Sequence, residues 1–223
     1  MKNFNLAIDG PAGAGKSTIA KRLATRLGFI YVDTGAMYRA MALYFLQNNI
    51  EASDVVRIEA ACKEVDITIM YQDGEQYVIL NGENVNGLIR TEEVGNMASA
   101  SSVNKTVRLK LVELQQNLAK KESVVMDGRD IGTYVLPDAD LKIYLTASSQ
   151  ERARRRWSEL NGKGIAADLD VIEQDIIERD HRDMTRDFAP LRQAEDAILL
   201  DTSDLSIDEV VDKILSLCHD KMR

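Results

Sequence analysis

Short apolar runs alternate with segments of helical periodicity at the start of the chain. The run at 4–8 stops at an Asp-Gly pair, and it predicts a buried strand. The segment 15–27 repeats apolar residues along one face of a helix, at Ile19, Ala20, Leu23, Ala24 and Leu27. A second strand is predicted at 29–33 and a second helix at 37–46. This alternation is typical of a parallel sheet with crossover connections.

The periodicity changes in the middle of the chain. Residues 66–71 alternate apolar and polar positions, and 76–80 form another β-rich run. The pairs Asp73-Gly74 and Asn81-Gly82 are turn signals that follow these two runs. The pattern predicts a small antiparallel sheet inserted into the strand–helix alternation.

Strand–helix alternation returns in the second half. Helical periodicity from about 91 to 120 indicates one helix or two. Strands are predicted at 124–126, 141–145 and 198–200, and an Arg-rich helix follows the second of them. The last helix opens with the capping box Ser206-x-x-Glu209. Its expected buried residues are Ile207, Val210, Val211, Ile214, Leu215 and Cys218. The whole pattern predicts one compact α/β unit with insertions and helices on both faces of the sheet.

Composition and charge exclude several classes of protein. The 223 residues include 28 Lys and Arg and 36 Asp and Glu, a formal net charge of −8. That balance argues against a broad surface for nucleic acid or anionic membranes. No apolar stretch approaches the roughly 20 residues of a membrane span, and Asp9 interrupts the first apolar run. We therefore expect a cytoplasmic protein with no membrane partner.

Cysteine and histidine give no sign of a metal centre. Cys62 and Cys218 stand far apart, so we expect two reduced thiols in or near the core. His181 and His219 are also isolated, so no histidine cluster or catalytic triad can be assembled from them. Candidate chemistry must come from other residues.

A phosphate-binding motif follows the first predicted strand. Residues 10–17, GPAGAGKS, match G-x-x-x-x-G-K-[ST], in which backbone amides surround phosphate oxygens. The strand before it and the helix after it supply the context that the motif requires. Lys16 is expected to reach the β- and γ-phosphates, and the Ser17 hydroxyl is expected to bind Mg²⁺.

Four further groups of charged residues accompany this loop. The segments 33–39, DTGAMYR, and 127–130, DGRD, each follow a predicted strand at the edge where ligands bind. The segments 152–156 and 178–186 are rich in arginine, and for both the alternative is a solvated face with local ion pairs. We expect the arginines of 152–156 to lack matching acids nearby. Together, the groups indicate a site for two phosphate-bearing ligands.

These motifs make the chain similar to the bacterial cytidylate (CMP/dCMP) kinases of the P-loop nucleoside monophosphate kinase family. The resemblance covers almost the whole chain: GPAGAGKST, DTGAMYR, the hairpin insert, DGRDIGT and ERDHRDMTR. It implies a P-loop NTPase fold, α/β, with a five-stranded parallel sheet flanked by helices. It also implies a small antiparallel β insert in the monophosphate-binding region and an Arg-rich helical lid. The implied parts are a core of about 1–36, 121–147 and 187–223, a monophosphate-binding region of about 37–120 with its insert at 66–90, a lid at about 148–166 and an Arg-rich helix at about 168–186.

The resemblance also implies roles for individual residues. The donor ATP would be held by Gly10, Pro11, Ala12, Gly13, Ala14, Gly15, Lys16, Ser17 and Thr18, with Arg152 and Arg156 of the lid. The acceptor CMP or dCMP would be bound by Thr34, Arg39, Ser99, Arg108, Arg129, Asp130, Arg179, Asp183 and Arg186. Among these, Arg39 and Arg129 would lie against the phosphate, Arg179 and Asp183 by the ribose, and Ser99, Arg108 and Asp130 near the cytosine. The residues expected to act in catalysis are Lys16, Arg129, Arg186 and Asp127.

The expected reaction is direct in-line transfer of a phosphoryl group from ATP to the monophosphate. No strong base is needed, because the acceptor phosphate is already ionised, so positioning and charge neutralisation carry the catalysis. Asp33 and Asp127 could orient Mg²⁺ through its waters, with Ser17 as a direct ligand. The family resemblance implies a monomer.

Three alternatives stay open at this point. Another small-molecule kinase, acting on UMP or of the shikimate type, would need no residues that read cytosine. A GTP-dependent switch would need Asn-Lys-x-Asp, but Asn104-Lys105-Thr106-Val107 lacks the aspartate. A DNA-binding module is disfavoured by the acidic charge.

Overall fold

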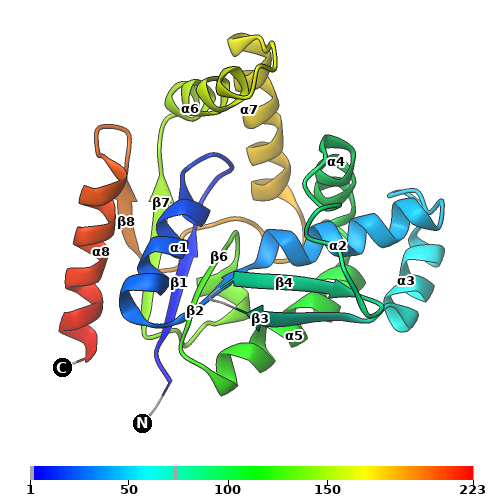
Figure 1. Ribbon diagram of the computed structural model, residues 1–223, viewed down its shortest axis with the longest axis horizontal. Helices are drawn as coiled ribbons and strands as arrows, with labels where there is room; N and C mark the ends of the chain where they lie inside the picture. The colour runs from blue at the N-terminus through cyan, green and yellow to red at the C-terminus, as the bar shows by residue number, and fades with distance from the viewer. Residues whose placement is uncertain (1–2, 73–74, 223) are drawn as a thin grey trace.

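A five-stranded parallel sheet forms the centre of the molecule (Figure 1). The computed structural model describes residues 3–72 and 75–222. The strands lie in the order β2 (Ile30–Asp33), β6 (Val124–Gly128), β1 (Asn5–Asp9), β7 (Leu141–Thr146) and β8 (Ile198–Asp201). Each adjacent pair is parallel, so the predicted sheet is confirmed in number and direction of strands.

Alternate residues of the central strands enter two separate cores. Leu6 and Ile8 of β1 pack on one face with α1 (Lys16–Leu27) and α8 (Ile207–Met222), whereas Ala7 between them faces the other core. Both faces of β1 are fully buried, which explains why the strand reads as a continuous apolar run rather than as an alternating one.

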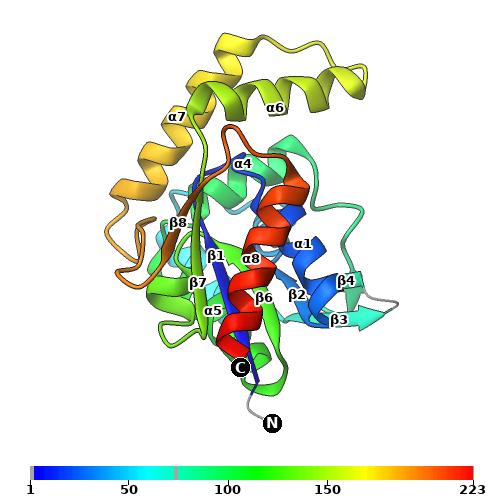
Figure 2. The same ribbon diagram turned by 90° about the vertical axis from the view of Figure 1, so that its left-hand side faces the viewer.

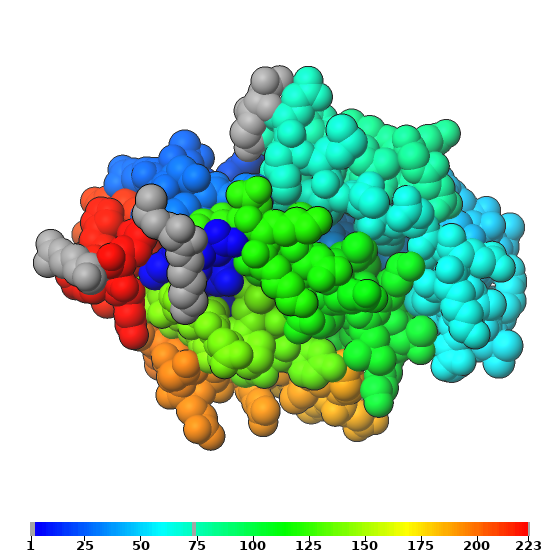
Figure 3. Space-filling view, turned by 90° about the horizontal axis from the view of Figure 1, so that it is seen from below, coloured from blue at the N-terminus to red at the C-terminus, as the bar shows by residue number. Residues whose placement is uncertain are grey.

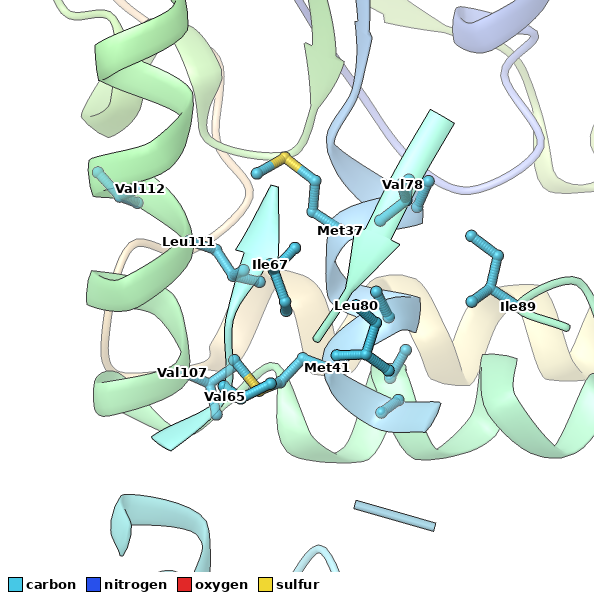
Figure 4. Packing of buried hydrophobic residues seen from close by; sticks show 14 of the residues in the cluster. Met37, Met41, Val65, Ile67, Val78, Leu80, Ile89, Val107, Leu111 and Val112 are labelled. Atoms are coloured by element: carbon cyan, nitrogen blue, oxygen red, sulfur yellow. The ribbon is translucent and has the colours of Figure 1, made fainter. Parts of the chain in front are cut away.

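The second core lies under α2 (Thr34–Gln47) and α5 (Lys105–Lys121), and it continues into the insert. Figure 4 shows Met37 and Met41 of α2 meeting Ile67 of the insert. Apolar burial thus joins the insert to the main sheet, at roughly 1.5–3 kcal/mol for each large side chain.

The insert is a three-stranded antiparallel sheet, as predicted. Its strands are β3 (Ile67–Gln72), β4 (Glu75–Leu80) and β5 (Glu83–Asn84), in that order. Asn81 and Gly82 both have positive φ, 49° and 88°, as a type I′ hairpin turn requires. The other predicted turn, Asp73-Gly74, lies outside the described residues.

One helix immediately precedes the insert and two follow it. α3 (Val55–Glu64) begins after Asp54, whose side chain accepts from the Arg57 amide at 3.0 Å. The sequence analysis assigned no element to this segment. The helical stretch after the insert is divided between α4 (Glu92–Ser101) and α5, because Asn104 caps the second helix. The prediction of one helix or two is therefore resolved as two.

α6 (Ser149–Gly162) and α7 (Leu169–Thr185) pack against each other above the carboxyl ends of the strands (Figures 1 and 2). From below, Figure 3 shows α8 and the α3 region at opposite ends of the molecule. The α6–α7 pair is thus the layer that faces the phosphate loop.

The last helix has the predicted cap. Ser206 Oγ accepts from the Glu209 amide at 3.3 Å, and the Glu209 carboxylate accepts from the Ser206 amide at 2.9 Å. Val210, Val211, Ile214 and Cys218 are buried and Leu215 is half-buried, but Ile207 is 44% exposed. The prediction for Ile207 was wrong because the first turn lies at the end of the buried stripe. Cys62 and Cys218 are buried free thiols, as predicted. Within residues 3–72 and 75–222, no helix is both long and apolar enough to cross a membrane.

Candidate functional site

The predicted phosphate loop connects β1 to α1. Gly10 has φ of +147°, and a Cβ at this position would lie 1.9 Å from the Leu145 carbonyl oxygen, so only glycine fits. Lys16 is buried, and its Nζ donates to the Pro11 carbonyl at 2.6 Å. Burial and the nearby Arg129 hold the pKa of Lys16 well below its usual range. The loop therefore keeps its lysine folded back along its own backbone.

Oxygen ligands gather beside the start of α1. Ser17 Oγ donates to Asp127 Oδ2 at 2.9 Å, and the Tyr31 hydroxyl donates to Asp127 Oδ1 at 2.9 Å. Burial and the carboxylate of Asp33 raise the pKa of Asp127 to about 6. No cluster of three or more His, Cys, Asp or Glu side chains suited to a metal occurs in the described part of the chain. One hydroxyl and two carboxylates nevertheless fit Mg²⁺, because this cation keeps several waters.

The segment that begins with Asp33 forms the end of β2 and the first turn of α2. Asp33 caps the helix by accepting from the Ala36 amide at 2.9 Å, so α2 begins at Thr34, three residues earlier than predicted. Thr34 Oγ1 donates to the Asp127 carbonyl at 2.6 Å. One turn further along the helix, Arg39 is half-buried, and burial lowers its pKa. β2 and β6 thus hold this turn and the DGRD segment side by side.

The insert reaches this part of the site through two residues that the sequence analysis missed. Gln76 of β4 accepts from the Asp33 amide at 2.8 Å and donates to the Asp33 carbonyl at 3.3 Å. Arg90 forms an ion pair with the Asp33 carboxylate at 2.7 Å. Neither residue lies in a motif, so no signal in one sequence distinguishes them from other polar residues of the insert.

Arg129 and Asp183 form a partly buried ion pair between β6 and α7. Arg129 Nε donates to Asp183 Oδ2 at 2.9 Å. Although burial raises the pKa of Asp183, the guanidinium groups of Arg129, Arg179 and Arg186 lower it overall. Arg179 Nε is buried with no hydrogen-bond partner among the described residues, and burial with Arg129 lowers the pKa of Arg179 to about 10. The three guanidinium groups outnumber the Asp183 carboxylate, so an anion bound here would neutralise the remaining positive charge.

Asp130 is the centre of a second buried cluster. Arg108, only 1% exposed, donates from Nη2 to Asp130 Oδ2 at 2.5 Å, and Arg186 donates from Nη2 to Asp130 Oδ1 at 3.2 Å. The Arg108 guanidinium lies 5.4 Å from the centre of the Tyr38 ring. Arg108 Nε is buried and finds no partner within residues 3–72 and 75–222. One free donor and the spare lone pairs of Asp130 suit a ligand with both an acceptor and a donor.

The turn after DGRD depends on a residue that the sequence analysis treated only as the end of a strand. Asp9 accepts from the amides of Ile131 and Gly132, at 2.8 and 2.7 Å, at the start of a single π-helical turn, η1 (Ile131–Val135). Burial raises the pKa of Asp9 to about 6. Since Asp130 immediately precedes η1, Asp9 holds the peptide that carries Asp130. In the sequence, the Asp-Gly pair at 9–10 indicated only the end of a strand, so this role of Asp9 was not predicted.

Ser99 lies on α4, away from the Asp130 cluster's hydrogen bonds. Its hydroxyl accepts from Arg182 Nη1 of α7 at 2.8 Å. This contact joins the helix after the insert to the helix that carries Arg179 and Asp183. The sequence analysis assigned no role to Arg182.

The arginines of 152–156 all have acidic partners, so the expectation that they lack matching acids was wrong. Arg152 is buried against Asp180 at 2.5 Å, Arg154 and Arg155 lie 4.0 and 3.0 Å from Glu151, and Arg156 lies 2.8 Å from Glu159. The last three pairs join neighbouring turns of α6, which is the local pairing that the alternative reading proposed. Arg152 differs because its partner comes from α7.

Taken together, the site places a phosphate loop and its lysine beside two clusters of arginine and carboxylate. Such an arrangement can neutralise two anions and hold them close. This is the chemistry of phosphoryl transfer between two bound ligands.

Comparison with known proteins agrees with this chemistry. The family model described as cytidylate kinase matches residues 6–220. The chain is 55% identical to the cytidylate kinase of Caldicellulosiruptor bescii, over 98% of this chain and 97% of that protein. It is 46% identical to the cytidylate kinase of Bacillus subtilis, over 100% of this chain and 99% of that protein.

Solved structures with the same fold are more distant. A shikimate kinase from Bacteroides thetaiotaomicron aligns with a TM-score of 0.51 at 15% identity, over 97% of this chain and 98% of that one. An uncharacterized protein from Eubacterium ventriosum aligns with a TM-score of 0.55 at 12% identity, over 96% of this chain and 98% of that one. These likenesses show a shared fold and carry no information about the substrate.

Proposed function

The chain belongs to the cytidylate kinase family, and we infer on this basis that it transfers the terminal phosphoryl group of ATP to CMP and dCMP. The products are ADP with CDP or dCDP. The alternatives of a UMP kinase or a shikimate-type kinase are not favoured, because relatives named cytidylate kinase match nearly the full length of the chain.

The buried cluster around Asp130 is the observation that carries the choice of base. Cytosine presents an amino donor beside a ring nitrogen that accepts. The carboxylate of Asp130 can accept from the amino group, and Arg108 can donate to the ring nitrogen. Uracil reverses both groups, so it would set an oxygen against the carboxylate and an N–H against a guanidinium. Ser99, whose hydroxyl accepts from Arg182 and not from this cluster, is assigned to the cytosine on the family resemblance alone.

Phosphate binding is assigned to a second set of arginines. Arg39, Arg129 and Arg186 would neutralise the acceptor phosphate, and Arg179, whose Nε lacks a partner among the described residues, would face the ribose with Asp183. Thr34, bound to the Asp127 carbonyl, fixes the turn on which these groups converge. Arginine suits this task because its planar fork binds two phosphate oxygens at once.

Donor binding is assigned to Gly10–Thr18, with Lys16 bearing on the charge that develops during transfer. Lys16 would leave the Pro11 carbonyl and turn to the phosphates when ATP arrives. We propose that Ser17 and Asp127 hold Mg²⁺ with Asp33 acting through water, and bound Mg²⁺ supplies charge neutralisation for the phosphates. Arg156, at the exposed face of α6, is assigned to ATP as a lid residue.

We further propose a monomer that works in the cytoplasm, apart from nucleic acid and membranes. A net charge of −8 opposes binding to nucleic acid, and two free buried thiols are typical of a reducing compartment.

A coupled assay of ADP release tests the proposed function. The panel should hold CMP, dCMP, UMP, AMP, GMP and shikimate, each with ATP and Mg²⁺. Highest kcat/KM for CMP and dCMP is expected, whereas a higher value for UMP or shikimate would contradict the assignment. Static light scattering of the same sample measures the mass and tests the monomer.

A further inference from the structure

The apex of the phosphate loop is held by a buried ion pair from outside the loop. Asp180 Oδ1 of α7 accepts from the Ala12 amide at 3.1 Å, and Arg152 Nη1 of α6 donates to the Ala12 carbonyl at 2.8 Å. Asp180 Oδ2 and Arg152 Nη1 are themselves 2.5 Å apart. Both polar groups of one loop residue are thus bound by side chains from two helices.

The surroundings of this pair are closed and specific. Arg152 and Asp180 are 6% and 7% exposed, and Arg152 Nε donates to the Ala147 carbonyl at 2.9 Å. A Cβ at Gly13 would lie 3.3 Å from Arg152 Cβ, so the loop backbone passes close to the base of the Arg152 side chain. Figure 2 shows α6 and α7 above this end of the sheet.

An isolated buried carboxylate at a phosphate loop would oppose an anionic ligand. Arg152 removes that conflict by neutralising Asp180, and it leaves one carboxylate oxygen to bind the Ala12 amide. The amides of the loop after Ala12 are then presented from a fixed peptide rather than from a mobile turn. Fixed donors bind more tightly because less freedom is lost when the ligand arrives.

We propose that Asp180 is a positioning residue of the donor site, which acts with Arg152 to hold the phosphate loop in its ATP-binding conformation. The proposal rests on the proposed function in taking ATP as the donor. It assigns Arg152 to the loop rather than to direct contact with the nucleotide. It also couples the α6–α7 layer to the donor site through two side chains.

Isothermal titration with ATP and CMP, each added alone in the presence of Mg²⁺, tests the proposal. Asp180→Asn turns an amide toward Arg152, so it breaks the pair without a change in size. The Kd for ATP should rise about 10-fold, as expected for a lost hydrogen bond between charged groups. The Kd for CMP should change by less than about 2-fold, because the residues assigned to CMP keep their own partners.

Matched variants separate positioning from folding. Asp196→Asn removes the partner of another buried cation, Lys142, and should leave both Kd values unchanged. Arg152→Gln combined with Asp180→Asn restores complementary polar groups and should recover most of the ATP affinity. If Asp180→Asn does not fold, Arg152→Lys serves instead, since it keeps the charge but loses the fork.

An unchanged Kd for ATP in Asp180→Asn or Arg152→Lys would overturn the proposal, as would equal weakening of ATP and CMP. A different result would contradict the proposed function itself. In that case the wild-type protein would not turn over CMP, whereas the effect of Asp180 on ATP binding would still be measurable.

Discussion

The donor and acceptor sides of the site are built in opposite ways. The proposed donor side is one continuous loop, Gly10–Thr18, whose expected binding groups are mostly backbone amides. The proposed acceptor side gathers side chains from α2, α4, α5, α7 and the segment after β6, which lie far apart in the sequence. A local loop conformation is enough to position the backbone amides of the donor side. The side chains of the acceptor side come from five segments, so only the complete fold brings them together. The comparison shows where changes of sequence affect chemistry alone and where they also affect stability.

Charge is handled differently on the two sides. Lys16 is buried with a lowered pKa, and within the described residues its Nζ donates to the Pro11 carbonyl rather than to a carboxylate. We therefore expect the fold not to depend on this side chain. On the acceptor side, Arg108, Arg129 and Arg186 each donate to a buried or partly buried carboxylate. Their positions are therefore part of the stability of the protein.

Lys16→Ala should have the largest effect on rate and almost none on stability. Loss of one preorganised charge at the transition state costs about 100- to 1000-fold in kcat. The Tm should stay the same or rise, because a buried cation is removed. Steady-state kinetics and thermal unfolding measure the two quantities. A large fall in Tm would show that Lys16 also supports the fold, and it would contradict the proposed difference between the two sides.

Arg129→Met should lower kcat/KM by about 10- to 100-fold, since it removes a charged hydrogen bond to phosphate. Asp183 would lose its partner at 2.9 Å but would keep Arg186 at 3.7 Å, so the loss of stability should be smaller. Steady-state kinetics with CMP and the Tm of the same preparation show whether the loss of activity exceeds the loss of stability. Retained specific activity with a lower Tm would make Arg129 a structural residue.

Asp127→Asn should change how stability depends on pH. Burial, followed by Asp33, raises the folded-state pKa of Asp127 from 3.8 to about 6. A raised pKa means that stability present below pH 3.8 is lost as pH rises through about 6. The neutral amide avoids that loss, so the variant should gain about 1–3 kcal/mol relative to wild type between pH 4 and pH 7. Denaturant unfolding across this range measures the gain, and parallel curves would contradict it.

Asp130→Asn should narrow the preference for CMP over UMP, which we expect to be about 10-fold or more in the wild type. An amide can turn its NH₂ toward the uracil oxygen. Arg108 and Arg186 would also lose a buried partner, so a lower Tm should accompany the change. The ratio of kcat/KM for the two substrates is independent of the folded fraction. An unchanged ratio would show that Asp130 supports the fold without reading the base.

Arg182→Met should have the smallest effect. The Arg182–Ser99 hydrogen bond is exposed and joins α4 to α7, so its loss should raise KM for CMP by about 2- to 5-fold with kcat unchanged. If Arg182 acts only through Ser99, then adding Ser99→Ala to Arg182→Met should not raise the KM for CMP any further. An equal rise of KM for ATP would extend the influence of α4 to the donor side.

Much of the fold could be predicted because its signals are local. The apolar runs, the Asn81-Gly82 turn and the Ser206–Glu209 capping box each involve neighbouring residues, and each has the predicted form. The predictions that were wrong also have a physical reason. Ile207 matches the buried stripe in spacing, but burial depends on what faces the first turn of the helix. The pairing of Arg155 with Glu151, by contrast, has the i,i+4 spacing of local ion pairs on a helix, so the sequence already contained its signal.

The sequence by itself determined the phosphate loop, because eight contiguous residues specify a backbone conformation whose amides form the site. It also indicated most of the strands and helices in their order along the chain, although not α3. Only the tertiary structure decided which charges pair: Asp9 with the η1 amides, Gln76 and Arg90 with Asp33, and Asp180 with Arg152. Such pairs join residues more than 25 positions apart, and their energy depends on burial and on distances that no local pattern encodes.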